Sequence, residues 1–292
     1  MRITILGSLG NIGKPLTELL VNGNHEVTVI SSSEDRKTEI ENLGAKAAIG
    51  TINDIDFLTG VFKQSDAVFT MTPPNMGGSD IIKNTTNAGG IIAKAISNSG
   101  IKRVVMLSSI GADSPVDNGP IKSLYNIEQL FNELQDVSVT ILRAGYFYTN
   151  LYGNIPMIKE MGIIGGNYPG SAAIALVHPK DIAVAVANDI IKVGTQNSIQ
   201  YIVSDYRTAD DIAEVLGKAI EKSDLKWVEF TDEQSLQGMQ QAGLPEEIAG
   251  IFTEMGLGIR TGVLQKDFLD KKSPIAGNTK LEDFAKEFAL SY

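Results

Sequence analysis

Short runs of apolar residues alternate with amphipathic stretches through the first half of the chain. The predicted strands are residues 2–6, 25–30, 45–49, 66–70, 102–107 and 137–142. The predicted helices are residues 15–21, 34–43, 54–63, 80–98 and 121–134. Buried strands that alternate with helices in this way are typical of a doubly wound parallel sheet, the Rossmann fold. The pattern therefore predicts an α/β protein whose first six strands complete such a sheet by about residue 150.

The second half of the chain has a different texture, beginning with glycine-rich loops at residues 162–170. Further strands are predicted at 172–177 and 199–203, and further helices at 180–192 and 208–221. We expect residues 1–150 to form an NAD(P)-binding domain and residues 151–292 to form a smaller α/β substrate lobe that returns twice to the main sheet. The sequence shows no internal repeat and no low-complexity tract.

The first strand runs directly into a glycine-rich turn and then into a helix. The turn consists of Gly7, Ser8, Leu9, Gly10, Asn11, Ile12 and Gly13. A strand, turn and helix in this order present backbone N–H groups and a positive helix end to an anion, usually the pyrophosphate of a dinucleotide. Gly7 permits the tight turn, Gly10 lets the phosphate approach the backbone, and Gly13 lets the helix pack closely on the strand. Glycine turns also occur without a ligand, but the strand at 25–30 completes a βαβ unit and favours cofactor binding.

Ligands of such sheets lie outside the carboxyl ends of the strands, so the residues that follow each strand are candidate contacts. No Asp or Glu lies directly at the end of the second strand, where a carboxylate would bind the ribose hydroxyls of NAD. The hydroxyls of Ser31 and Ser32, with Arg36 and Lys37 a few residues later, suit a 2′-phosphate instead. This segment favours NADP(H), with NAD(H) left open. A simple turn and helix start would also explain the same residues.

The segments after the later strands supply the remaining candidates. Met71, Thr72 and Pro73 would lie along the nicotinamide ribose, and Ser108 and Ser109 follow the fifth strand at the same edge of the sheet. The predicted substrate pocket consists of Pro74, Asn75, Tyr125, Tyr146, Phe147, Tyr148 and Asn150. Its aromatic run would stack a conjugated acceptor. An ordinary loop after the fourth strand, and packing of the aromatic rings between the two lobes, are equally open alternatives.

Composition and charge narrow the class of protein further. The net charge of −10 disfavours direct binding to nucleic acid or to an anionic membrane. The absence of cysteine removes disulfides, thiolate nucleophiles and cysteine-bound metals, and with only His25 and His178 as histidines we expect no metal site. The chain enters a strand at once and has no apolar run of about 18 residues, so we expect a soluble cytoplasmic protein without a signal peptide.

Several motifs together give the chain a resemblance to a known family. They are the GxxGxxG spacing of Gly7, Gly10 and Gly13, the segment 95–104, the pair Ser108-Ser109, the segment from Thr140 to Asn150, the segment 177–183 and the segment 242–245. In order and spacing they resemble the NmrA-like family of atypical short-chain dehydrogenase/reductases, and within it bacterial NAD(P)H:quinone oxidoreductases and triphenylmethane reductases. The resemblance implies a Rossmann fold, an NAD(P) cofactor and a small-molecule acceptor. A homodimer or a protein partner stays open.

The chain departs from the wider superfamily at the usual Tyr-x-x-x-Lys pair, which protonates the substrate and holds the ribose. Aligned on Glu128, the tyrosine position holds Pro120 and the lysine position holds Leu124. Neither residue exchanges a proton, so we assign no catalytic residue. A conjugated acceptor can take hydride and collect its proton from water, which favours a quinone-type reductase over an alcohol dehydrogenase or sugar epimerase. The alternative is a redox sensor that binds NAD(P) without catalysis. Arg143 is expected to close a strand end, and Asp181 to start or cap a helix.

Overall fold

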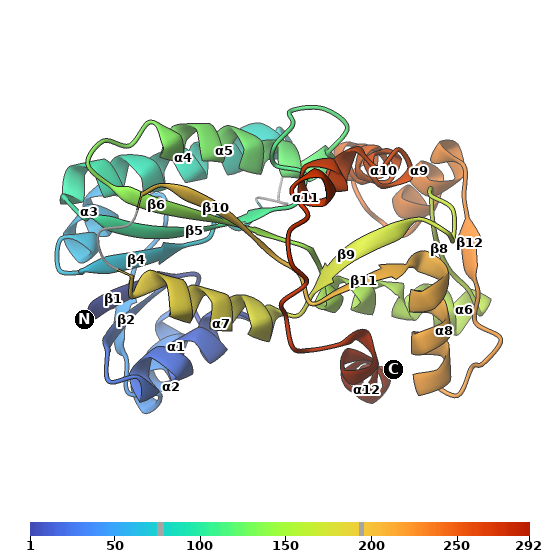
Figure 1. Cartoon of the computed structure of the whole chain (residues 1–292), viewed down its shortest axis with the longest axis horizontal. Coiled ribbons are helices and arrows are strands. Elements are labelled where there is room, and N and C mark those ends of the chain that lie inside the picture. Colours follow the sequence, from blue (N-terminus) through green and yellow to red (C-terminus); the bar gives the residue numbers. More distant parts are fainter. Residues whose placement is uncertain (75–78, 193–195) are drawn as a thin grey trace.

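The structure is a computed structural model that describes residues 1–74, 79–192 and 196–292. Its centre is a parallel sheet of seven strands in the order β10-β6-β5-β4-β1-β2-β3 (Figure 1). These strands are β1 (Arg2–Leu6), β2 (Glu26–Ser31), β3 (Lys46–Ile49), β4 (Ala67–Thr70), β5 (Arg103–Ser109), β6 (Ser138–Ala144) and β10 (Ser198–Ile202). The order reverses beside β1, as a doubly wound fold requires, and all six strands predicted in the first half are present.

Helices cover both faces of this sheet (Figure 1). One face carries α1 (Gly13–Asn22), α2 (Lys37–Asn42) and α7 (Pro179–Ile190), and the other carries α3 (Ile55–Phe62), α4 (Ile81–Ser99) and α5 (Lys122–Asn132). Side chains of β1 alternate between the two cores: Ile3 and Ile5 pack with α1 and α7, whereas Leu6 packs with α3 and α4. This two-sided burial explains why the strands read as nearly continuous apolar runs.

The second half of the chain contributes to the main sheet in one strand and one helix. β10 pairs with β6 as the seventh strand, and α7 packs beside α1. The strand predicted at 172–177 is β9 (Ala173–Val177), and it does not return to this sheet. It pairs antiparallel with β11 (Asp205–Thr208) and parallel with β7 (Tyr146–Phe147). Of the two strands predicted in this half, β10 joins the main sheet and β9 does not, because an apolar strand pattern does not specify which sheet the strand joins.

The remaining elements surround this small sheet (Figure 1). Two short strands, β8 (Ile164–Gly166) and β12 (Trp227–Glu229), pair with each other, and β8 lies in the stretch that we predicted as glycine-rich loop. The helices are α6 (Ile155–Met161), α8 (Ala209–Ala219), α9 (Asp232–Gln241), α10 (Glu246–Arg260), α11 (Lys266–Asp270) and α12 (Leu281–Ser291), with 3-10 turns η1 (Glu34–Arg36), η2 (Gly119–Ile121), η3 (Tyr148–Asn154) and η4 (Val263–Gln265). None of the helices in the described ranges is both long and apolar enough to span a membrane.

A hydrogen-bonded segment ties the end of the chain to the start of α7. The side chain of His178, not that of Asp181, caps this helix by accepting a hydrogen bond from the backbone N–H of Lys180 at 3.0 Å. Asp181 lies in the first turn and accepts from the Ser204 hydroxyl at 2.6 Å and from the Thr279 N–H at 3.0 Å. Asp181 therefore anchors the segment that leads into α12 and does not cap the helix.

Candidate nucleotide site at the carboxyl end of the sheet

Two glycines of the turn between β1 and α1 are required by the packing of the protein itself. Gly7 has a φ of +134°, and a Cβ there would lie 2.5 Å from the sulfur of Met71. A Cβ on Gly13 would lie 1.9 Å from the carbonyl oxygen of Ser8, because α1 starts directly against the turn. A larger residue at Gly7 would strain the backbone and displace the Met71 side chain, and one at Gly13 would force the backbone apart.

Gly10 differs from these two glycines. It is exposed, and the nearest atom to a Cβ at this position would be the carbonyl oxygen of Gly7, 3.8 Å away. Its φ also lies outside the left-handed region, so neither packing nor backbone strain demands a glycine there. Gly10 keeps a patch of backbone bare beside the N-terminal end of α1, where an anion would find unpaired N–H groups and a favourable helix dipole.

The segments after β1, β2 and β4 meet at this turn. The backbone N–H of Ser8 donates to the carbonyl oxygen of Ile30 at 3.0 Å, and the Ser8 hydroxyl donates to the hydroxyl oxygen of Ser31 at 3.1 Å. Met71 lies against Gly7 from the other side. Leu9 and Ile12 are buried, whereas Asn11 and Ser32 are exposed. The structure thus brings Ser31 and Met71 to the glycine turn.

The two cations after β2 are already paired with carboxylates. Arg36 Nη1 lies 2.7 Å from Glu39 Oε2, and Lys37 Nζ lies 3.7 Å from Glu34 Oε1. Glu39 also contacts Lys14 of α1, with 3.5 Å between Lys14 Nζ and Glu39 Oε1. All of these side chains are at least one-third exposed, so they are accessible to a ligand.

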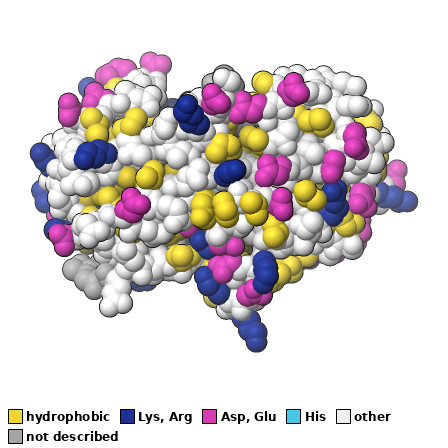
Figure 2. Space-filling model, turned by 90° about the horizontal axis from the view of Figure 1, so that it is seen from above, with side chains coloured by type: hydrophobic (Ala, Val, Ile, Leu, Met, Phe, Trp, Pro, Cys, Tyr) yellow, Lys and Arg dark blue, Asp and Glu magenta, His cyan; other side chains and the backbone are white. Residues whose placement is uncertain are grey.

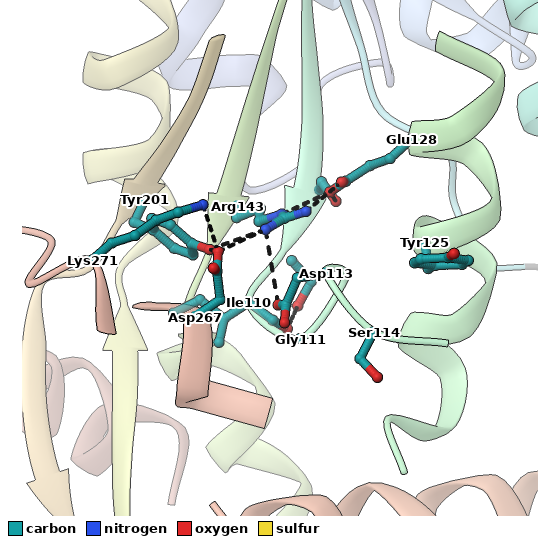
Figure 3. Close-up of polar contacts among 12 residues, drawn as sticks. Ile110, Gly111, Asp113, Ser114, Tyr125, Glu128, Arg143, Tyr201, Asp267 and Lys271 are labelled. Atoms are coloured by element: carbon teal, nitrogen blue, oxygen red, sulfur yellow. Dashed lines mark hydrogen bonds and ion pairs between the residues drawn. The ribbon is translucent and has the colours of Figure 1, made fainter. Parts of the chain in front are cut away.

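Ser108, at the end of β5, is buried and faces the helix α5. Its hydroxyl donates to Glu128 Oε1 at 2.6 Å, and the same carboxylate forms hydrogen bonds with Arg143 Nε at 3.0 Å and Nη2 at 2.7 Å (Figure 3). The Ser109 hydroxyl donates to the carbonyl oxygen of Ile110 at 2.9 Å and is partly exposed. Of this pair, Ser109 is the residue with access to solvent at the edge of the sheet.

Arg143 joins strand β6 and helix α5 to the C-terminal part of the chain (Figure 3). Its Nη1 donates to Tyr201 Oη at 3.0 Å and to Asp267 Oδ2 at 3.1 Å, and lies 3.9 Å from Asp113 Oδ1. The Tyr201 hydroxyl donates to Asp267, which also pairs with Lys271 Nζ at 2.8 Å. Burial disfavours the charged form of Arg143. The hydrogen bonds to Glu128 and the charge of that carboxylate outweigh burial and raise the pKa of the Arg143 guanidinium. Arg143 therefore fixes α5, β6, β10 and α11 to one another.

The sequence predicted that Arg143 closes a strand end. It did not predict the contacts of Arg143 with Asp113, Tyr201 and Asp267. Asp267 lies 124 positions from Arg143 and carries no local signature of the pairing. A buried arginine at the carboxyl end of a strand was the one available signal, because such a charge must find carboxylate partners.

The aromatic run after β6 does not form one surface. Phe147 packs beside the same core as Met71, whereas Tyr146 packs with the core of the C-terminal half, and burial raises its pKa to about 12. Tyr148 is fully buried and stacks on Phe284 of α12, with 5.1 Å between ring centroids. Tyr148 is therefore an interior residue and does not form a wall open to an acceptor.

The other pocket candidates are dispersed. Tyr125 is partly buried on α5, Asn150 is exposed in η3, and Pro74 is exposed after β4 (Figure 3 shows Tyr125). Thr72 is partly buried and Pro73 exposed, while Asn75 lies outside the described residues. The described contacts do not join these side chains into one lined cavity.

Two shallow grooves lie on the face of the sheet opposite α1, over α3, α4 and α5. Figure 2 looks down on this side, where hydrophobic side chains alternate with acidic and basic ones. The groove of about 390 Å³ includes Glu247 of α10, whose carboxylate accepts from the backbone N–H groups of Asp80 at 2.9 Å and Ile81 at 2.7 Å. The N-terminus of α4 is thus capped by a residue from the far half of the chain.

Comparison with known proteins agrees with this architecture. The model of the NmrA-like family matches residues 1–266, and the chain belongs to that family. Among curated proteins it is 24% identical over 256 residues to an NAD(P)H azoreductase of Xenophilus azovorans, covering 87% of this chain and 85% of the relative. It is 23% identical over 188 residues to the photosystem II assembly factor Ycf39 of Synechocystis, covering 63% of this chain and 56% of that protein.

Solved structures share the fold over almost the whole chain. The NADPH-dependent quinone oxidoreductase QOR2 of Escherichia coli, solved with NADPH, has a TM-score of 0.83 at 19% identity, with 98% of this chain and 99% of that chain covered. The triphenylmethane reductase of Citrobacter sp., solved with NADP(H), has a TM-score of 0.78 at 19% identity, with 98% and 99% covered. The Rossmann-like fold and the family predicted from the sequence are both confirmed.

Proposed function

We propose that this chain is an NAD(P)H-dependent reductase that transfers hydride to a quinone, a dye or a similar conjugated acceptor, with NADPH as the preferred cofactor. The observation that carries the proposal is Gly10, the glycine of the β1–α1 turn that the fold does not need. Bare backbone at that point, beside the N-terminal end of α1, suits the close approach of a pyrophosphate. The azoreductase, the quinone oxidoreductase and the triphenylmethane reductase support the same class of reaction.

The residues around the turn have distinct roles in this proposal. The turn from Gly7 to Gly13 binds the pyrophosphate, while Ser31, Ser32, Arg36 and Lys37 hold the 2′-phosphate. The bound cofactor supplies the hydride. Met71 packs on the turn and borders the nicotinamide side, and the partly exposed Ser109 lies at the end of β5. The two-electron reduction of a quinone also needs a proton, which water delivers to the reduced oxygen at an accessible site.

The missing Tyr-x-x-x-Lys pair is consistent with this assignment. Leu124 packs against the hydrophobic core under α5, and Pro120 lies in η2. A quinone can take its proton from water, whereas oxidation of an alcohol or of a sugar hydroxyl needs a side chain that removes the hydroxyl proton. Cytoplasmic location and the identity of the acceptor stay predictions.

The experiment that tests the proposal combines titration with turnover. We expect the wild-type protein to bind NADPH and to oxidise it when a panel of quinones and azo dyes is added. Gly10→Val should abolish NADPH binding without loss of thermal stability, because its side chain would occupy the phosphate position and not the core. Gly60→Val is the matched control, since Gly60 is an exposed glycine of α3 whose Cβ would meet no described heavy atom within 4 Å beyond its chain neighbours and its own helix backbone. A folded Gly10→Val protein with unchanged NADPH affinity would refute the site.

A second candidate is a redox sensor that binds NAD(P) and performs no reduction. The packing of Leu124 favours it, because the residue at the position of the usual lysine is partly buried against the core and offers no polar group. The relative Ycf39, named as an assembly factor, supports a non-enzymatic role within this fold. Binding of NADPH without turnover of any acceptor, together with a partner whose affinity differs between NADPH and NADP⁺, would favour the sensor.

A further inference from the structure

Glu39 bridges two cations from different elements of the proposed nucleotide site. Its carboxylate lies 2.7 Å from Arg36 at the end of η1 and 3.5 Å from Lys14 in the first turn of α1. Lys14 directly follows Gly13, and its backbone N–H donates to the carbonyl oxygen of Gly10 at 3.1 Å. Glu39 therefore connects the glycine turn after β1 with the segment after β2.

The carboxylate of Glu39 is an anion at neutral pH. The hydrogen bond from Arg36 lowers its pKa; burial opposes this, and the charge of Arg36 and the hydrogen bond and charge of Lys14 lower the pKa further. Its side chain is 38% exposed, so the pair of cations that it holds also faces solvent. Arg36 and Lys14 bring two positive charges together beside the end of β2, which favours the binding of an anion. In this structure the Glu39 carboxylate occupies that position.

We propose that Glu39 sets the selectivity of this protein between NADPH and NADH by competing with the cofactor's 2′-phosphate for Arg36 and Lys14. This inference rests on the proposed function. A 2′-phosphate carries nearly two negative charges, so binding it requires Arg36 to leave Glu39 and brings like charges close together. NADH has an uncharged ribose at this position and meets neither cost. Glu39 therefore lowers the affinity for NADPH relative to that for NADH, and lets the same site accept NADH.

The test measures dissociation constants of both cofactors by calorimetric titration of the whole chain. Glu39→Gln keeps the shape of the side chain and removes its charge. We expect NADPH to bind about fivefold more tightly to this variant, and NADH to change by less than about twofold. The gain should shrink as salt is raised from about 0.05 M to 0.5 M, because both ends of the interaction are exposed.

Two further variants make the result specific. Glu41→Gln removes one negative charge, as Glu39→Gln does, but two residues further along α2. Because it keeps the carboxylate of Glu39, it should leave both affinities unchanged. In an Arg36→Ala background, Glu39→Gln should lose most of its effect on NADPH, because the cation for which the two anions compete is absent.

The outcomes separate this inference from the proposed function. A selective gain for NADPH that depends on Arg36 supports the role of Glu39. Equal changes for both cofactors, a loss of NADPH affinity, or the same gain in Glu41→Gln would overturn it while leaving the reductase proposal intact. A wild-type protein that binds neither cofactor would overturn both.

Discussion

Two buried arginines stand at opposite ends of the central sheet. Arg103 begins β5, at the amino end, and Arg143 lies near the end of β6, at the carboxyl end where ligands of this fold bind. Arg103 pairs with Asp189 of α7 and donates to the hydroxyl of Thr140 at 2.9 Å. Both arginines are 5% exposed, and each forms its pair with a carboxylate that is also buried.

The two arginines differ in what they join. Arg103 connects β5, β6 and α7, which all belong to the main sheet and its covering layer. Arg143 connects α5 and β6 with α11, which arrives from the far end of the chain (Figure 3). The same chemistry therefore stabilises the fold at one end and builds the frame of the proposed site at the other.

The largest expected effect is that of Arg143→Met. It leaves the Glu128 carboxylate, 1% exposed, with the hydroxyl of Ser108 as its described hydrogen-bond donor. We expect a loss of about 3 to 5 kcal/mol in the free energy of unfolding, measured by urea denaturation. Adding Glu128→Leu should recover much of that loss, because the uncompensated charge is then gone. A loss below about 1 kcal/mol would show that the buried charges are not coupled.

Arg103→Met should cost less, about 2 kcal/mol in the same measurement. The Asp189 carboxylate would keep hydrogen bonds from Lys192 at 2.8 Å and Gln200 at 3.0 Å, so its charge stays partly compensated. The dissociation constant for NADPH should not change, because Arg103 lies at the end of the sheet away from the glycine turn. A tenfold change in that constant would contradict the division of roles between the two arginines.

Tyr201→Phe probes the carboxyl end more gently. It removes the hydroxyl that accepts from Arg143 and donates to Asp267, and should reduce the free energy of unfolding by about 1 kcal/mol. Tyr206→Phe is the matched control, because Tyr206 also packs on Phe268 but lies outside the Arg143 contacts. Equal losses in the two variants would assign the effect to packing and not to the charged network.

The smallest effect concerns pH at the amino end. Burial disfavours the charge of Asp189, but hydrogen bonds from Lys192, Thr140 and Gln200 and the charge of Arg103 outweigh it and lower its pKa below the ordinary 3.8. The stabilisation is therefore complete above pH 3.8 and is lost as pH falls through the lower folded-state pKa. The penalty of Arg103→Met should stay constant between about pH 5 and pH 4 and shrink as pH falls below 3.8, which denaturation at each pH would measure. A constant penalty would contradict the coupling.

Local signals were sufficient for the elements of the fold but not for all of their partners. The six strands of the first half were predictable because each is an apolar run bounded by turn residues, and the glycine turn was predictable because the spacing of Gly7, Gly10 and Gly13 lies within one βαβ unit. The pairing of Arg143 with Asp267 was not, since no sequence pattern relates positions 124 residues apart. Tyr148 shows the same limit: its sequence position fits a pocket wall, and only the packing of α12 buries it.

The sequence by itself determined the parallel sheet, the glycine turn and the family, because hydrophobic periodicity and turn chemistry are written in neighbouring residues. The tertiary structure decided which sheet β9 joins, that a Cβ has room at Gly10 but not at Gly7 or Gly13, and that Glu39 holds Arg36 and Lys14 together. These features depend on distances between segments that meet only after the chain has folded. Such distances follow from the packing of the whole molecule and from no local pattern.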